Sequence, residues 1–408
     1  MLDNVILLDW AAFAVRWLHV ITAIAWIGSS FYFIALDLGL RRAAASPEGV
    51  TGEQWQVHGG GFYHLQKYNV APAALPEHLV WFKWESYATW LSGFALLALL
   101  YYAGAELYLV DPNVRQLSSG TAILLSVGSL IVGWLAYDLA CKSPLGRDNT
   151  RLMLALFVAL TFAAWGYTQI FTGRAALLHV GALTATWMSA NVFLVIIPNQ
   201  KIVVADLRAG RTPDPKYGVI AKQRSTHNNY LTLPVIFLML STHYPLAFAT
   251  PYNWLIASLV FLMGVTIRHY FNSVHAGRGR PHWTWAATAV VFATIVALSM
   301  LPAREPAETI ADVNLGRAVT AHLEAPGFDE AFRVVRTRCL MCHAEHAVWP
   351  GLNSRARAVK LDTEARVAAE ARAIYLHSGV SHSMPPGNRS GMTAAERAVI
   401  RDWHAAGR

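Results

Sequence analysis

Charged side chains are scarce in this chain of 408 residues, because Asp, Glu, Lys and Arg together make up 14% and hydrophobic residues 55%. Soluble domains carry about a quarter charged residues, so the composition indicates a membrane protein. Acidic residues are missing altogether from 215 to 303, whereas both signs are frequent after Leu301. This change predicts a boundary near 302–306, with a membrane part, 1–303, followed by a small terminal domain, 304–408.

Cysteine is also rare, with three in the chain, and this excludes a disulfide framework. Two belong to one motif, and Cys141 stands alone at a predicted helix end, with no role that the sequence reveals. The N-terminus lacks a basic segment and a cleavage site, so the first apolar run is interpreted as a retained anchor. The formal charge is +8, but the basic residues lie in short loops between apolar runs. We therefore predict a lipid bilayer as partner and no nucleic acid.

Long apolar runs dominate the first 301 residues. A bilayer core of about 30 Å needs about 20 residues of helix, and eight runs approach that length. The predicted fold class is therefore all-α, an eight-helix transmembrane bundle with a small terminal domain. The eight runs lie near 11–38, 86–103, 121–140, 152–172, 175–197, 230–249, 252–270 and 284–301.

Lysine and arginine predict the orientation of these spans, since they gather on the cytoplasmic side. The loops after the first, third and fifth spans hold four, three and six of them. The N-terminus and the loops after the second, fourth and sixth spans hold none, one, one and none. Both termini are therefore predicted outside, in the periplasm, the compartment in which haem is attached covalently.

The terminal domain contains the haem attachment pattern C-x-x-C-H, formed by Cys339, Cys342 and His343. The thiols add to the haem vinyl groups, and the adjacent imidazole becomes the first axial ligand of the iron. A zinc knuckle is the alternative, but it needs a second cysteine pair that the chain does not contain. The motif predicts one covalent haem c.

The second axial ligand is expected downstream of the motif. Met384 is the best candidate, because a thioether ligand raises the reduction potential and the two prolines that follow it stiffen its loop. Met392 is the nearest alternative and His382 the next. A soluble carrier would consist of this domain alone, so its fusion to eight helices suggests that the membrane part feeds it electrons.

Two histidines lie inside predicted spans, where a polar group without a partner is unfavourable in free energy. His19 and His179 start from the same face and reach similar depth, which suits a bis-histidine haem b in the membrane part. Hydrogen bonds to neighbouring helices would satisfy them as well. Arg16 and Arg174 near that face suit haem propionates, or extend their charges to the interface.

The cytoplasmic side has two polar segments of interest. The first carries His58 and His64 around three glycines, which allow close backbone approach to a ligand. The second contains His227, Asn228 and Asn229 just before the sixth span. Two adjacent carboxamides can recognise a polar heterocycle, or they can cap the sixth helix.

Three stretches of the sequence together resemble one family. The chain is similar over its whole length to the membrane-bound, cytochrome-c-linked urate oxidases (urate hydroxylases) of bacteria, and the three stretches lie at 58–63, 81–93 and 227–234. This resemblance implies an inner-membrane enzyme of purine catabolism that oxidises urate to 5-hydroxyisourate. It also implies that electrons leave through the cytochrome to a respiratory acceptor, without forming hydrogen peroxide. A shorter stretch, 17–28, resembles the first helix of small membrane protoporphyrinogen oxidases, whose corresponding histidine ligates haem b.

The resulting hypothesis is an oxidoreductase. Oxidation of urate needs a base, a polar clamp for the carbonyl groups and an electron path. His227, Asn228 and Asn229 are predicted to provide the clamp and base, with His58 and His64 as further candidates. Two alternatives remain, a membrane electron conduit fed by quinol or a partner subunit, and a transporter with a redox sensor. The His- and Gly-rich first loop favours an enzyme over a conduit.

Overall fold

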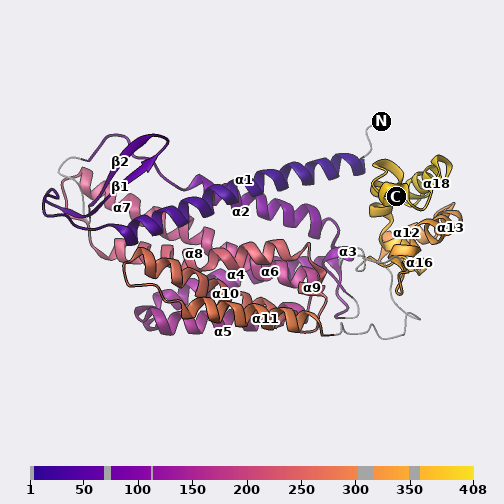
Figure 1. Cartoon of the computed structure of the whole chain (residues 1–408). Helices are drawn as coiled ribbons and strands as arrows, with labels where there is room; N and C mark the ends of the chain where they lie inside the picture. The colour runs from indigo at the N-terminus through magenta and orange to yellow at the C-terminus, as the bar shows by residue number, and fades with distance from the viewer. Residues whose placement is uncertain (1–3, 69–74, 112–113, 302–315, 349–358) are drawn as a thin grey trace.

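The computed structural model describes residues 4–68, 75–111, 114–301, 316–348 and 359–408. The boundary that the sequence predicts near 302–306 lies outside these residues. Figure 1 shows a long helical bundle with the N-terminus and a group of short C-terminal helices at one end and a β-hairpin at the other. The predicted termini and the predicted first loop are therefore at opposite ends of the bundle.

Each predicted apolar run is mainly helical, although the run near 230–249 is interrupted by a turn after Ser241. Five helical segments are long and apolar enough to cross a membrane, and Trp283–Ser299 is a shorter apolar helix. The helices of the bundle and its ends are α1 (Asn4–Gly39), α2 (Trp84–Leu97), α3 (Ala105–Tyr108), α4 (Ser119–Lys142), α5 (Asn149–Thr168), α6 (Gly173–Ala190), α7 (Ile197–Arg208), α8 (Lys216–Ser241), α9 (Pro245–Phe248), α10 (Asn253–His275) and α11 (Trp283–Ser299). Wider π-helical turns, η1 (Ala98–Tyr102) and η3 (Asn191–Ile196), extend α2 and α6, and a 3₁₀ turn, η2 (Pro144–Arg147), precedes α5.

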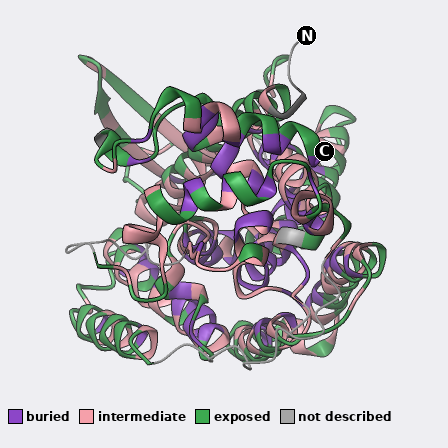
Figure 2. Cartoon of the chain, turned by 90° about the vertical axis from the view of Figure 1, so that its right-hand side faces the viewer, coloured by how far each residue is buried: buried purple, intermediate pink, exposed green. Residues whose placement is uncertain are grey.

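The outer surface of the bundle is strongly apolar. In Figure 2 buried residues face the interior of the bundle, whereas the outward surfaces are mainly exposed. Those exposed positions carry large hydrophobic side chains, such as Leu124 on α4, Phe162 on α5 and Val290 on α11, whose exposed fractions are 72%, 69% and 66%. A water-soluble bundle places polar residues there, so this surface suits contact with lipid.

The centre of the bundle is α6, most of whose side chains are buried. Around it, close helix contacts depend on small residues. A Cβ atom on Gly264 of α10 would lie only 2.5 Å from Cδ of Pro234 on α8, so this glycine lets α8 and α10 approach each other. These two helices carry the polar side chains described below.

The segment predicted as a His-rich cytoplasmic loop contains a β-hairpin, which the all-α prediction missed. Strand β1 (Val50–His58) pairs antiparallel with β2 (Gly61–Tyr68). Gly59 and Gly60 connect them with φ of +58° and +80°, the left-handed conformation that tight hairpin turns require. Nothing lies within 4 Å of a Cβ built at either position. The turn conformation therefore explains why glycine occupies both positions.

The C-terminal residues pack around a hydrophobic cluster of their own, whose buried members run from Val319 to Trp403. Its helices are α12 (Arg317–Leu323), α13 (Phe328–Arg338), α14 (Leu340–His343), α16 (Glu364–Ala369), α17 (Ala371–Ile374) and α18 (Ala394–Ala406), with the turns η4 (Tyr375–Val380) and η5 (Pro386–Asn388). Arg372 on α17 pairs with Asp9 on α1 at 3.3 Å, so this small domain contacts the end of the bundle.

Candidate functional site

The C-x-x-C-H motif begins where α13 ends. Cys339 terminates that helix, and the short α14 carries Cys342 and His343. His343 donates from Nδ1 to the carbonyl oxygen of Val359 at 2.9 Å. This bond leaves Nε2 with the lone pair that a metal needs, and a carbonyl acceptor behind the ring is the usual support of a ligating histidine. Both thiols are free. The motif residues therefore fit a covalently bound haem.

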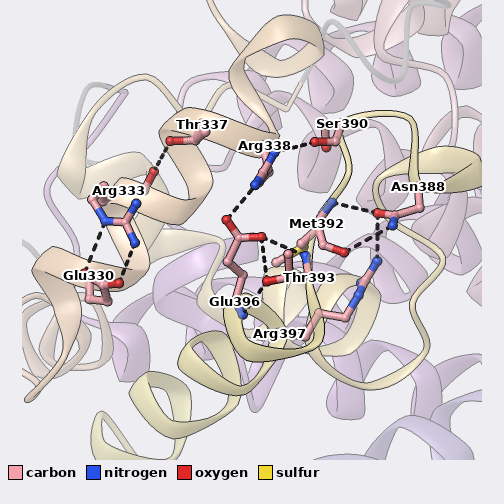
Figure 3. Close-up of polar contacts among 10 residues, drawn as sticks. All are labelled: Glu330, Arg333, Thr337, Arg338, Asn388, Ser390, Met392, Thr393, Glu396 and Arg397. Carbon is pink, nitrogen blue, oxygen red and sulfur yellow. Dashed lines mark hydrogen bonds and ion pairs between the residues drawn. The ribbon is translucent and has the colours of Figure 1, made fainter.

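Two arginines connect the motif to the loop that carries Met384, as Figure 3 shows in part. Arg338, the residue before Cys339, donates to Glu396 at 3.0 Å and to the carbonyl of Ser390 at 2.6 Å. Arg397, on the same helix as Glu396, donates to the carbonyl of Met384 at 2.9 Å. Helix α18 thus holds both the attachment motif and the predicted ligand loop.

The three candidates for the second axial ligand differ in their surroundings. Met384 is 36% exposed on its loop, whereas Met392 is 3% exposed and packs in the hydrophobic cluster of the domain. His382 is exposed and has a φ of +54°. Met384 can therefore reach a ligand without disturbing the core, which Met392 cannot do.

Near the opposite end of the bundle, His227, Asn228 and Asn229 lie inside α8, so they do not cap it. The helix begins eleven residues before His227, at Lys216. Successive residues of a helix point in directions about 100° apart, and these three side chains contact different neighbours. His227 and Asn228 belong to one buried network with α4 and η3, whereas Asn229 faces α10. They do not form the single clamp that the sequence suggested.

The first network is built around Tyr137 and Asn191. Asn191 donates to the Tyr137 hydroxyl and to Asn228 Oδ1, each at 2.9 Å. Arg224 donates to Asn191 Oδ1 at 3.1 Å and pairs with Asp138 at 2.7 Å. The Tyr137 hydroxyl also forms a hydrogen bond with His227 Nδ1 at 2.8 Å. The other ring nitrogen of His227, Nε2, is buried and has no partner among the described residues.

The second network lies on the other side of α8. Arg268 of α10 donates to Asn229 Oδ1 from Nε and from its terminal nitrogen, both at 3.2 Å, and to Asn272 Oδ1 at 3.0 Å. The ring of Phe31 lies over the guanidinium at 4.2 Å. Among the described residues no carboxylate pairs with Arg268, and Nδ2 of Asn229 is buried without a partner. A buried cation beside an unused donor is suited to an anion.

His58 and His64 lie away from these networks, on the hairpin. His58 is exposed beside the turn. His64 contacts Glu53 at 3.0 Å and stacks on Trp55 with ring centroids 4.3 Å apart. Asp37 of α1 pairs with both Lys67 of β2 and Lys222 of α8, and these two ion pairs link the hairpin to α8.

The two histidines predicted to share a haem b have different partners. His179 is fully buried, with Nδ1 bonded to the carbonyl of Ala175 at 2.7 Å and Nε2 to Ser126 at 2.6 Å. His19 faces α2, where Nδ1 donates to the carbonyl of Thr89 at 3.0 Å. Both ring nitrogens of His179 are engaged by protein, whereas Nε2 of His19 has no hydrogen bond within the described residues. In this structure His179 is therefore held by hydrogen bonds within the bundle, which was the alternative to haem ligation.

Several polar residues of these networks were missed by sequence reasoning. Arg268 had a clear signal, since a cation inside an apolar run is a candidate functional residue. Tyr137 had none, because its partner His227 is 90 positions away. Asn191 begins the π-helical η3, and such turns are frequent at functional sites.

Comparison with known proteins gives one match. The family described as urate oxidase, N-terminal, matches residues 5–299. No curated protein and no solved structure matches the chain. The matched range covers the helical bundle and its hairpin and ends before the C-x-x-C-H motif.

Proposed function

The chain belongs to the urate oxidase N-terminal family, and from that premise we propose that it is a membrane-bound oxidase of urate that passes electrons to its own haem c. The observation that carries the proposal is the joining of two parts in one chain. The matched part ends at residue 299, and the C-x-x-C-H motif follows on a domain that contacts the same bundle through Arg372 and Asp9.

The reaction is a two-electron oxidation. Urate and water give 5-hydroxyisourate, two protons and two electrons, and the oxygen of the water is added at C5. Cys339, Cys342, His343 and Met384 would hold the haem c. That group would supply a one-electron acceptor, so two equivalents would be needed for each urate and no hydrogen peroxide would form. A respiratory acceptor then takes up the electrons.

The Arg268 network is our proposed urate site. Urate is a flat anion at neutral pH, and it carries carbonyl oxygens that accept hydrogen bonds. Arg268 offers a positive charge without a carboxylate partner in the described chain, and Asn229 Nδ2 offers an unused donor. The ring of Phe31 over the guanidinium marks a face on which a planar purine can stack in its place. His227 and Asn228 belong to the network on the other side of α8, so their proposed role is to hold this helix, and with it Asn229, in position.

The proposed arrangement in the membrane follows the distribution of lysine and arginine. The hairpin and the Arg268 end of the bundle face the cytoplasm, and the terminal domain lies in the periplasm of a bacterial inner membrane. A reporter that is active only in the periplasm should be active after Arg408 and silent at Gly210. The opposite result would overturn the orientation.

Urate consumption by the purified, detergent-solubilised protein tests the function. Addition of urate should reduce the haem c, with two haem equivalents reduced per urate consumed and no peroxide released. Xanthine, which is a purine at a lower oxidation level, serves as the control substrate and should give no reduction. A protein whose haem c is reduced by quinol but never by urate would support the conduit instead and overturn this proposal.

A further inference from the structure

The bundle contains a cavity of about 350 Å³ among α1, α2, α6 and the C-terminal end of α8. Most of its lining is aliphatic or aromatic, and Trp90 and Phe94 contribute large rings. Arg174 and Thr186 both line it from α6, and twelve residues of helix span about 18 Å. The cavity is therefore long, and its size and apolar walls suit a flat hydrophobic molecule.

One end of this cavity is basic. Arg16 and Arg174 line it from the bundle, and Arg372 reaches it from the terminal domain. The Nε atom of Arg174 is buried and has no hydrogen-bond partner among the described residues. Buried donors in folded proteins are normally paired, so a molecule bound in the cavity should place an acidic group at this end.

His19 also lines the cavity, and its ring is prepared for a metal. Because a carbonyl only accepts, the bond to Thr89 fixes the hydrogen on Nδ1 and the lone pair on Nε2. Ser92 contacts the same Nδ1 at 3.1 Å. A Cβ on Gly93 would lie 2.9 Å from His19 Cε1, so the glycine allows this position of the ring. His343 is supported by a carbonyl in the same way.

The cavity also lies between the two ends of the proposed reaction. At its inner end, Trp26 lines it from α1, five residues before Phe31, whose ring lies over Arg268. At its outer end, Arg16 and Arg174 line it together with Arg372 of the terminal domain. From Phe31 to Arg16 helix α1 measures about 22 Å. Electron transfer weakens steeply with distance, so a redox group between these ends shortens the step.

We propose that the cavity holds a non-covalent b-type haem, with His19 as axial ligand through Nε2 and the propionates at Arg16 and Arg174. A quinone would not use the two arginines, and a phospholipid would not use His19. The inference rests on the proposed function in one respect, because a second haem lets one chain accept both electrons of one urate. His179 is not a ligand in this assignment.

The test is a haem inventory of the purified, full-length protein. Acidified acetone extracts haem b but leaves thioether-bound haem c, and the two give different pyridine haemochromes. We expect about one extractable haem per covalent haem in the wild type. His19→Gly should lose the extractable haem and keep the covalent one, and added imidazole should restore it. The control is His269→Gly, on α10, where the ring contacts Trp283 and does not line the cavity; it should keep both haems.

The outcomes separate this inference from the proposed function. Wild-type protein that oxidises urate but yields only covalent haem would overturn the haem b assignment and leave the function standing. Quinone in the extract in place of haem would also overturn it. Retention of extractable haem in His19→Gly would exclude His19 as ligand. Protein that contains both haems but fails to oxidise urate would refute the function and leave the cavity assignment intact.

Discussion

Arg268→Gln is the substitution that most directly probes the proposed urate site. The glutamine amide can still donate to Asn229 Oδ1, which now accepts two bonds of 3.2 Å from Arg268, but the positive charge is lost. Removing one partner of a buried charged pair typically costs about 2–5 kcal/mol. At about 1.4 kcal/mol per factor of ten, KM for urate should rise roughly 30- to 4000-fold.

The assay is the initial rate of haem c reduction as urate is varied, with protein quantity taken from covalent haem. Arg278→Gln is the matched control, because it removes one arginine from the exposed turn after α10 and should leave KM unchanged. Reduction of the haem by dithionite shows whether each variant is folded and loaded. If Arg268→Gln is intact by that criterion and keeps the wild-type KM, urate does not bind at this network.

Three further predictions concern the terminal domain. Replacing Cys339 and Cys342 with alanine should abolish haem staining of the 44.9 kDa band on denaturing gels; persistent staining would exclude the motif as the attachment site. Met384→His should lower the reduction potential measured by redox titration, whereas Met392→Leu, in the core, should leave the potential unchanged and cost less than about 1.5 kcal/mol. Glu396 accepts from the backbone of Thr393, and this bond lowers the pKa of its carboxyl. Its stabilising contribution is present above the ordinary glutamate pKa and is lost as the pH falls through the lowered value. In unfolding followed by haem absorbance, Glu396→Ala should therefore cost about 1 kcal/mol at neutral pH and weaken the loss of stability on acidification; equal stability of both proteins at neutral pH would contradict this.

The helices were predictable because a bilayer imposes a length and an apolar composition on each span. The predicted runs are mainly helical, but the run near 230–249 crosses the break between α8 and the short α9, and other bounds differ at the ends. The sixth helix starts at Lys216, well before the apolar run near 230, and its first five residues are mostly exposed. Hydropathy reports only the apolar part of such a helix.

The hairpin was missed although its signal was present. Two segments rich in aromatic and β-branched residues flank Gly59-Gly60, and a two-residue glycine loop favours a hairpin. The sequence prediction interpreted the glycines as space for a ligand, which left the strands unrecognised. The polar networks were out of reach for another reason, since Tyr137, Asn191 and Arg268 meet α8 from three different helical segments.

The side chains of His227, Asn228 and Asn229 also limit the insertions and deletions that α8 can tolerate. Since one residue corresponds to a turn of about 100°, inserting or deleting a single residue just before His227 would turn each of the three side chains away from its present partners. His227 would leave Tyr137, and Asn229 would leave Arg268, in the same step. The helix therefore has a single rotational setting that satisfies both networks. Length changes in this chain should be tolerated in the 209–215 turn but not between Arg224 and Pro234.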